Sequence, residues 1–381
     1  MKKLAIIGAS YLQEPLIQKA KSRGIETHVF AWKCGDIGEY STDFFYPISI
    51  VEKEQILEKC KEIGVDGICT IASDLAVITV NYVASHMGLI SNSMDCTDMS
   101  TNKHKMRECF MRNGDPSPKS IMVETISDLD SYDIEYPVIV KPVDRSGSRG
   151  ITKVLRYEDL ECAIENAKEQ GFEKKALVEE FATGQEYSVE FISWQGKHEF
   201  LALTKKYTTG APDFIETGHI EPAPVDKDML ERVKVVVIHA LDSLGVKYGA
   251  SHSEIKISKS GEIKIIEIGG RMGGDFIGSS LVELSTGYDF ISAVIDVALG
   301  IKPEYSRNSE KYAAVHFIFS DKDVECLNRL KRENPEILIS EEVHDITGQK
   351  VVDSGSRFGY FLFAGNDKDD IEKYLPKNGE E

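Results

Sequence analysis

Two glutamates on a predicted β-hairpin have the residue type and spacing of a metal site. We expect strands at 253–258 and 262–268, joined by a Ser-Lys-Ser-Gly turn. In that register Ile265 lies opposite Glu254, so Glu254 and Glu267 lie diagonally on one face with Cα atoms roughly 7–8 Å apart. Oxygen ligands without cysteine favour magnesium, with substrate phosphates completing its shell. The alternative is that both acids pair across the strands with lysines of the hairpin.

A lysine at the end of an apolar strand precedes a loop suited to phosphate. The segment 137–150 reads Pro-Val-Ile-Val-Lys-Pro-Val-Asp-Arg-Ser-Gly-Ser-Arg-Gly, so the strand ends at Lys141. Lysine is a compact charge that binds phosphate. Backbone N–H groups around Gly147 and Gly150 can form an anion-binding concavity, although the Walker A pattern is absent. The alternative is a surface hairpin with a solvated lysine.

A third segment, 177–190, has the pattern of a buried strand that leads into a connector. Leu177, Val178 and Phe181 are its apolar positions. A connector of this kind can offer backbone N–H and C=O groups to the edge of an adenine, and Glu186 can accept hydrogen bonds from ribose hydroxyls. An ordinary pair of strands with exposed acids is the alternative.

The three segments, in this order and at this spacing, resemble the ATP-grasp superfamily over about 102–300. The resemblance implies ATP and Mg²⁺ as cofactors, and Mn²⁺ can take the same ligands. It implies that Lys103 and Lys141 contact the phosphates and that a loop with Ser146, Gly147, Ser148 and Gly150 covers them. The hinge on the adenine side would be formed by Glu179, Glu180, Phe181 and Ala182. Glu186 would accept from the ribose, and Glu254 and Glu267 would be the metal ligands.

One position departs from the superfamily pattern. Many members have asparagine two residues after the second metal glutamate, whereas this chain has Gly269. A metal ligand is therefore missing, or water or another residue supplies it. The resemblance further implies that Arg271 steadies the transferred phosphate or the acyl phosphate, and that Arg271 and Lys141 are the catalytic residues.

Within the superfamily, the segments 212–219 and 267–274 resemble carboxylate–amine ligases, including the L-amino acid ligases that make dipeptides. Such enzymes activate a carboxylate as an acyl phosphate, join it to an amine and release ADP and phosphate. The resemblance implies substrate contacts at Glu216, His219, His252, Gly270 and Arg271. The alternatives are a surface histidine at 219 and a tight glycine loop after the strand.

Two other functions stay open. The first is a carboxylase of the purine or biotin type, which phosphorylates bicarbonate. The second is an ATP-binding regulator that has lost turnover, and Gly269 is the residue that favours it.

Two regions with different patterns of strands and helices must position these residues. The first hundred residues alternate short apolar strands with helices, which predicts a parallel sheet covered on both faces. Later strands and helices do not alternate strictly, which indicates α+β. We therefore expect a Rossmann-like N-terminal α/β domain at 1–100, an ATP-grasp domain at 101–300 with a mobile lid subdomain at about 118–185, and a C-terminal subdomain at 301–381.

Composition excludes several partners. A net charge of −18 over 381 residues argues against nucleic acid, because phosphate backbones require basic patches. Apolar runs are too short for a membrane-spanning helix, which predicts no membrane partner. The seven scattered cysteines contain no CxxC pair, which favours a cytoplasmic location without structural zinc. We expect small-molecule carboxylate and amine substrates, with a homodimer as an open option.

Overall fold

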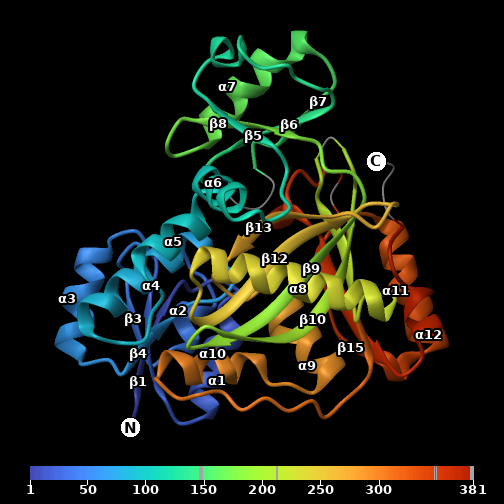
Figure 1. The fold of residues 1–381 in the computed structure, drawn as a ribbon. Helices are drawn as coiled ribbons and strands as arrows, with labels where there is room; N and C mark the ends of the chain where they lie inside the picture. The colour runs from blue at the N-terminus through green and yellow to red at the C-terminus, as the bar shows by residue number, and fades with distance from the viewer. Residues whose placement is uncertain (146–148, 212, 347, 349, 378–381) are drawn as a thin grey trace.

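The computed structural model describes residues 1–145, 149–211, 213–346, 348 and 350–377. Its strands form three sheets: a four-stranded N-terminal sheet at the left of Figure 1, a four-stranded sheet that projects at the top, and an eight-stranded sheet from the centre toward the right. We call the projecting sheet, with the helix that packs on it, the lid. The predicted combination of a parallel α/β unit with an α+β part is confirmed.

The N-terminal sheet is parallel throughout, in the order β3-β2-β1-β4. Leu4–Ile7 is wholly buried, as expected of a parallel strand covered on both faces. The strands are β1 (Lys3–Ile7), β2 (Glu26–Phe30), β3 (Phe44–Tyr46) and β4 (Gly67–Cys69), and the helices are α1 (Glu14–Ser22), α2 (Gly38–Ser41), α3 (Lys53–Ile63) and α4 (Asp74–Met87).

The lid is an antiparallel sheet in the order β5-β8-β6-β7 with one helix on it. Its helix buries residues at the i, i+3, i+4, i+7 spacing, from Leu160 to Ala167, against the apolar strand residues. The elements are β5 (Ser120–Val123), β6 (Val138–Pro142), β7 (Thr152–Val154), β8 (Ala176–Glu180), α7 (Leu160–Gln170) and the 3₁₀ turns η1 (Ile126–Leu129) and η2 (Tyr157–Asp159).

The eight-stranded sheet has the order β13-β12-β9-β10-β11-β14-β16-β15, so the strands after residue 301 extend the sheet of the central region. Its strands are β9 (Gln185–Trp194), β10 (Lys197–Thr208), β11 (Glu216–Glu221), β12 (Tyr248–Ile257), β13 (Ile263–Gly269), β14 (Tyr312–Phe317), β15 (Leu338–Val343) and β16 (Gly359–Gly365). The remaining elements are α5 (Met94–Thr101), α6 (Lys103–Asn113), α8 (Lys227–Leu244), η3 (Ile277–Leu281), α9 (Val282–Thr286), α10 (Phe290–Ala298), α11 (Asp321–Glu333), η4 (Pro335–Ile337), η5 (Ser354–Ser356) and α12 (Lys368–Glu372).

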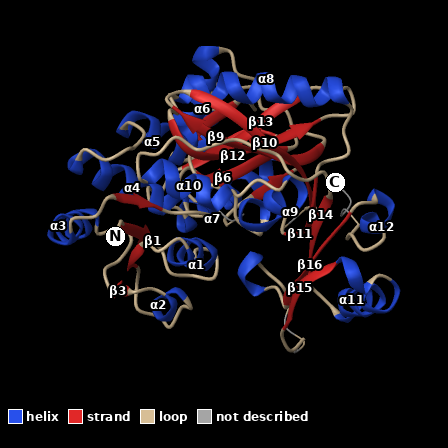
Figure 2. Ribbon diagram, turned by 90° about the horizontal axis from the view of Figure 1, so that it is seen from below, coloured by secondary structure: helices blue, strands red, loops and turns tan. Residues whose placement is uncertain are grey.

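The two faces of this sheet differ in chemistry. One face packs against α8, which lies across β9, β10, β12 and β13 (Figure 2). Along β9, Tyr187, Val189 and Phe191 belong to this apolar core. Because strand side chains alternate, the residues between them, Glu186, Ser188 and Glu190, lie on the opposite face, which we call the polar face.

The register predicted for the β12–β13 hairpin is wrong. Glu254 lies opposite Glu267, and Ile255 lies opposite Ile265, so Ile266 is an extra residue in β13. The strands are also shifted by one residue next to the turn, where Ile257 lies opposite Ile263, and this shift places Ile265 in the core under α8. The bulge then reverses the alternation, so that Glu267 faces away from this core. The two glutamates are therefore direct neighbours on the polar face. The backbone groups released by the bulge are bound elsewhere, since the Ile266 carbonyl accepts a hydrogen bond from the Arg107 guanidinium at 2.6 Å.

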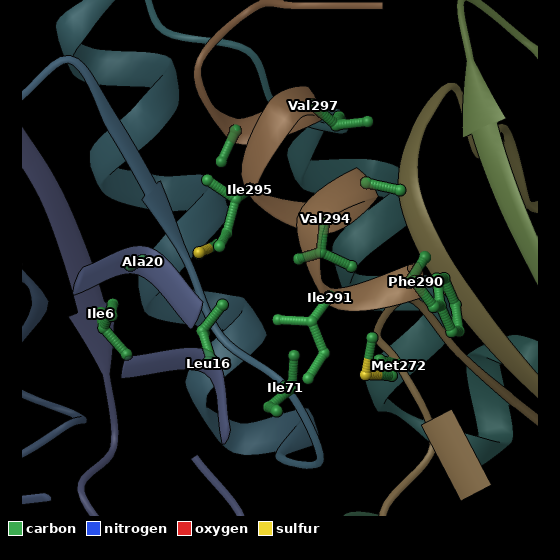
Figure 3. Close-up of a cluster of buried hydrophobic side chains, with 14 of the residues drawn as sticks. Ile6, Leu16, Ala20, Ile71, Met272, Phe290, Ile291, Val294, Ile295 and Val297 are labelled. Atoms are coloured by element: carbon green, nitrogen blue, oxygen red, sulfur yellow. The ribbon is translucent and has the colours of Figure 1, made fainter. Parts of the chain in front are cut away.

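An apolar core joins the N-terminal sheet to α10 of the central region (Figure 3). Ile6, Leu16 and Ile71 lie on one side of it, and Ile291 and Val294 of α10 lie on the other. Burial of this kind fixes the end of β4 next to the polar face of the large sheet. Within the described residues, the longest apolar helical stretch falls short of what a bilayer crossing requires.

Candidate active site

A cleft of about 1040 Å³ lies between the lid and the polar face of the large sheet. Its walls come from segments far apart in the sequence, with β6 and β8 above β12 and β13 (Figure 1). Most predicted site residues line it: Lys103, Lys141, Glu179, Glu180, Phe181, Ala182, Glu186, Glu216, His252, Glu254, Glu267 and Arg271.

The other predicted residues lie elsewhere. Gly150 lines a separate hollow, and Gly270 borders a neighbouring apolar cavity that shares Arg271 with the cleft. His219 is wholly buried, so the reading of a surface histidine is wrong. Among the described residues its ring nitrogens have no hydrogen-bond partner. The predicted loop residues 146–148 lie outside the described residues.

Two residues of the lid, Lys141 on β6 and Glu179 on β8, line the cleft, and the buried Arg107 of α6 pairs with Glu179. We call Arg107, Lys141 and Glu179 the cationic cluster. The Lys141 ammonium lies 2.6 Å from one Glu179 oxygen, and Nε of Arg107 lies 2.9 Å from the other. Burial alone would raise the pKa of Glu179, but the two cations lower it to about 2. With two cations against one anion, the cluster has an uncompensated positive charge next to the cleft.

A second lysine lies beside this cluster. Lys103 is the first residue of α6, whose start the Asn102 side chain caps. The Lys103 backbone N–H donates to the Val143 carbonyl at 2.8 Å, which ties the helix to the end of β6. Its ammonium donates to Glu267 at 2.6 Å and to the Arg145 carbonyl at 2.7 Å. Local capping and one backbone bond thus bring the two predicted phosphate lysines to one cleft.

The polar face carries the opposite charge. We call Lys206, Glu186, Glu216 and Glu254 the acidic cluster. The buried Lys206 ammonium lies 2.8 Å from both Glu186 and Glu254, and 3.6 Å from Glu216. Burial alone would lower the pKa of Lys206, but these carboxylates raise it well above its usual value. One ammonium thus faces three carboxyl groups, and the cluster favours an additional cation.

The chemistry of a metal site here rests on two carboxylates. Glu254 and Glu267 are opposite each other in register, and each now binds a lysine, Lys206 and Lys103 respectively. The described part of the chain contains no group of three or more His, Cys, Asp and Glu residues arranged for a metal. Mg²⁺ commonly uses one or two protein carboxylates and completes its shell with phosphates and water, so the donor set fits Mg²⁺ bound together with a phosphorylated ligand.

The side chains of the predicted hinge residues form contacts with neighbouring residues. The Glu180 carboxylate forms an ion pair with Lys264. The Phe181 ring has the Lys153 ammonium 3.8 Å from its centroid and the Lys256 ammonium at 5.3 Å. Ala182 is buried beside them. These contacts fix the exit of β8 at the edge of the cleft.

Arg271 forms a bidentate ion pair with Asp74, the first residue of α4. Nε of Arg271 lies 2.8 Å from Oδ1 of Asp74, and an NH2 nitrogen lies 3.0 Å from Oδ2. A Cβ atom at Gly269 would lie only 2.6 Å from the same Oδ1. With Asp74 in this position, a side chain at residue 269 would require the Asp74 carboxylate to move.

His252 lies in a buried dyad next to the acidic cluster. Its Nδ1 is 2.5 Å from Glu190, whose other oxygen accepts from the Gly273 backbone N–H at 3.1 Å. Its Nε2 lies 3.6 Å from Glu254. Burial alone would lower the pKa of His252, but the Glu190 carboxylate raises it to about 9. The imidazole is thus cationic at neutral pH and points toward the cleft.

Sequence reasoning missed Lys206 and Asp74, although each has a signal. Lys206 follows the short apolar run Phe-Leu-Ala-Leu at 200–203 of β10, and a lysine after an apolar run is the pattern that singled out Lys141. Asp74 follows the carboxyl end of the parallel strand β4, where ligands of open α/β sheets bind. Glu190 and Arg107 had no comparable signal, because their roles depend on contacts between distant segments.

Comparison with known proteins agrees with this architecture. Residues 134–279 match the model of the ATP-grasp domain. The alanine–anticapsin ligase of Bacillus subtilis (strain 168) is 28% identical over 245 residues, which is 58% of this chain and 51% of that protein. The chain thus spans about half the length of this known relative.

Solved structures extend the likeness to nearly the whole fold. The L-amino acid ligase from Bacillus licheniformis superposes with a TM-score of 0.85 at 23% identity, over 98% of this chain and 96% of that one. A phosphoribosylglycinamide synthetase from Anaerococcus prevotii gives 0.77 at 20% identity, over 97% and 96%. The expected resemblance to the ATP-grasp domain is confirmed by the match over residues 134–279.

Proposed function

We propose that this chain is an ATP-dependent ligase that converts a carboxylate into an acyl phosphate and couples it to an amine, with an amino acid as substrate. The observation that carries the proposal is the pairing of two oppositely charged clusters across one cleft. A nucleoside triphosphate with a divalent cation needs both charges. The likeness to an alanine–anticapsin ligase and to an L-amino acid ligase supports amino acids as the substrates.

The nucleotide is assigned to the lid side of the cleft. Lys141 and Lys103 would bind its phosphates, and Glu179–Ala182 would lie along the adenine. Glu186 would accept from the ribose. Since Lys141 and Lys103 now bind Glu179 and Glu267, phosphate binding exchanges one set of charge contacts for another and leaves no buried lysine without a partner.

The metal is assigned to the carboxylates on the polar face. Glu254 and Glu267 are the residues that would bind Mg²⁺ or Mn²⁺, and Asp74 lies near the position that Gly269 leaves vacant of a side chain. Bound there, the cation would offset the negative charge of the ATP phosphates.

The reaction needs positioning more than covalent chemistry from the protein. A carboxylate oxygen of the substrate attacks the γ-phosphorus, and the bond to ADP breaks. Arg271 and Lys141 neutralise the charge on the transferred group. The amine then attacks the acyl carbon, loses a proton and displaces phosphate. Asp74 orients the Arg271 fork through its two hydrogen bonds.

The test is a coupled ADP-release screen over pairs of amino acids and other carboxylates, with a bicarbonate arm. We expect ADP and phosphate only when both a carboxylate and an amine are present. Formation of AMP and pyrophosphate would refute the proposal. Dependence on bicarbonate would assign the carboxylase chemistry, and ATP binding without turnover in every arm would assign a regulator.

A further inference from the structure

Glu190 is a buried carboxylate beside the cleft to which the proposed reaction gives no role. It belongs to β9 and lies directly opposite His252 of β12, so the two side chains share the polar face. Glu190 is wholly buried, and among the described residues His252 is its ion-pair partner. Removing one member of a buried ion pair leaves the other without compensation, so each residue depends on the other.

Glu190 fixes the imidazole ring together with the chain after Arg271. One Glu190 oxygen, Oε1, lies 2.5 Å from Nδ1 of His252, and the other accepts from the Gly273 backbone N–H at 3.1 Å. A Cβ atom at Gly273 would lie 2.7 Å from that Nδ1, and 3.1 and 3.2 Å from the two Glu190 oxygens. The dyad thus leaves no room for a side chain at Gly273. These contacts fix Nδ1 on Glu190 and leave Nε2 to face a different group.

That group is Glu254, a proposed metal ligand, and two cations approach the same one of its oxygens. Nε2 of His252 lies 3.6 Å from Oε1 of Glu254, and the Lys206 ammonium lies 2.8 Å from that same Oε1. Glu254 lines the cleft and lies opposite Glu267. Partners of this kind around a metal-binding side chain set its orientation.

We infer that the Glu190–His252 dyad positions Glu254 for the divalent cation. Together with Lys206 it holds Oε1, so that Oε2 turns toward Mg²⁺ or Mn²⁺ in the cleft. His252 thus acts through Glu254 instead of contacting the substrate, which is the role that the resemblance implies. The inference rests on the proposed function, which assigns the metal to Glu254 and Glu267.

Two conservative substitutions separate the two ends of the imidazole. His252→Asn can place an amide near the position of Nδ1 and keep the contact with Glu190, whereas His252→Gln can place an amide near the position of Nε2 and keep the contact with Glu254. Both remove the same charge, so a difference between them reports the contact with Glu254. In the presence of ADP, we expect His252→Asn to raise the Kd of Mn²⁺ about tenfold and His252→Gln to raise it no more than about threefold.

A second variant reaches the dyad without removing either member. The methyl group of Gly273→Ala would displace His252 or Glu190, and this variant should also raise the Kd of Mn²⁺ about tenfold. Should His252→Asn fail to fold, Gly273→Ala decides the result.

His198→Asn is the matched control. His198 lies on β10 of the same sheet, and its ring also contacts a carboxylate, with Ser193 at 2.7 Å and Asp242 at 3.4 Å. It lies outside the set of residues that line the cleft. The Kd of Mn²⁺ in His198→Asn should stay within about twofold of the wild-type value, because the two sites share no partner.

Mn²⁺ binding is measured by EPR of free Mn²⁺ at a fixed ADP concentration, and circular dichroism reports whether each variant is folded. Binding with the expected pattern, but without ADP release in the substrate screen, would refute the ligase function and leave the role of the dyad in place. Three results would overturn the inference: equal Mn²⁺ affinity in His252→Asn and His252→Gln, an unchanged Kd in folded His252→Asn or Gly273→Ala, or no Mn²⁺ binding to wild type.

Discussion

The cationic cluster and the acidic cluster are built from the same residue types in opposite proportion. In the first, Glu179 faces two cations, Lys141 and Arg107. In the second, Lys206 faces the carboxylates of Glu186, Glu216 and Glu254. The cationic cluster is buried, whereas the carboxylates around the buried Lys206 are half-buried, and within each cluster the charges are neutralised only in part. The difference indicates what each can receive: an anion beside the lid and a cation on the polar face.

Two buried glutamates show how strongly the counter-ions decide the charge state. Glu179, next to two cations, has a pKa of about 2. Glu221, on β11, is wholly buried and binds the hydroxyls of Thr204 and Ser285 at 2.8 and 2.6 Å. Burial raises the pKa of Glu221 to about 7, because hydroxyls compensate desolvation less well than cations do. Depth alone therefore does not set the charge of a carboxylate in this protein.

The largest expected effect is the loss of the lysine in the cationic cluster. Lys141→Met should lower turnover by about a thousandfold, because it removes a charge that meets the transferred phosphate. Steady-state ADP release measures this. Lys175→Met is the control, since Lys175 belongs to the same lid but pairs at the surface with Glu124. Equal losses in the two variants would contradict the role of Lys141.

The acidic side should respond through magnesium. Glu254→Gln and Glu267→Gln should each lower turnover by about a hundredfold and raise the Mg²⁺ concentration needed for half-maximal rate. The measurement is a Mg²⁺ titration of ADP release. Glu262→Gln changes the same hairpin at an exposed position and should behave as wild type. Folded glutamine variants with normal Mg²⁺ dependence would separate these carboxylates from the metal.

Removing Glu179 should reduce stability. Glu179→Gln leaves Lys141 and Arg107 buried without their counter-ion, at a cost of about 3 kcal/mol in the free energy of unfolding. The pKa of Glu179 is lowered in the folded state, so its contribution is present above the unfolded pKa near 4.5 and is lost as pH falls toward 2. Chemical denaturation at pH 7 measures the difference. An unchanged midpoint would show that the two cations do not depend on Glu179.

The smallest expected effect is a change of stability with pH in the opposite direction, in which stability falls as pH rises. The folded pKa of Glu221 is raised to about 7, so its ionisation in the folded state becomes costly as pH rises from 4.5 through 7. Relative to Glu221→Gln, wild type should lose about 2 kcal/mol of unfolding free energy between pH 5 and pH 8. Urea denaturation of both proteins across this range tests it. A parallel pH dependence of the two proteins would show that Glu221 does not titrate in this range.

Local patterns in the sequence predicted most of the fold and the identity of the cleft residues. The alternation of strand and helix before residue 100 predicted the parallel sheet, and the strand ending at Lys141 predicted a cleft residue. The hairpin register failed at two points: the strands are already shifted by one residue next to the turn, where Ile257 lies opposite Ile263, and the extra residue Ile266 then forms a bulge whose carbonyl binds a distant partner. Turn chemistry alone does not encode such a bulge.

Ion pairs between residues far apart in the sequence were the other feature that the sequence patterns did not predict. The Arg271–Asp74 pair joins residues 197 positions apart, and its Asp74 carboxylate lies close to the place that a side chain at residue 269 would occupy. Spacing within one segment contains no information about that contact. The same holds for Lys206, whose three carboxylate partners come from different strands.

The fate of a carboxylate oxygen tests the proposed chemistry most directly. A carboxylate substrate found in the ADP-release screen is labelled with ¹⁸O in both carboxylate oxygens and turned over with ATP and the amine. If the carboxylate attacks the γ-phosphorus, its bridging oxygen leaves with phosphate. Mass spectrometry should then detect one ¹⁸O in each phosphate released and one in the product carbonyl. Unlabelled phosphate, or label in AMP, would contradict an acyl phosphate intermediate.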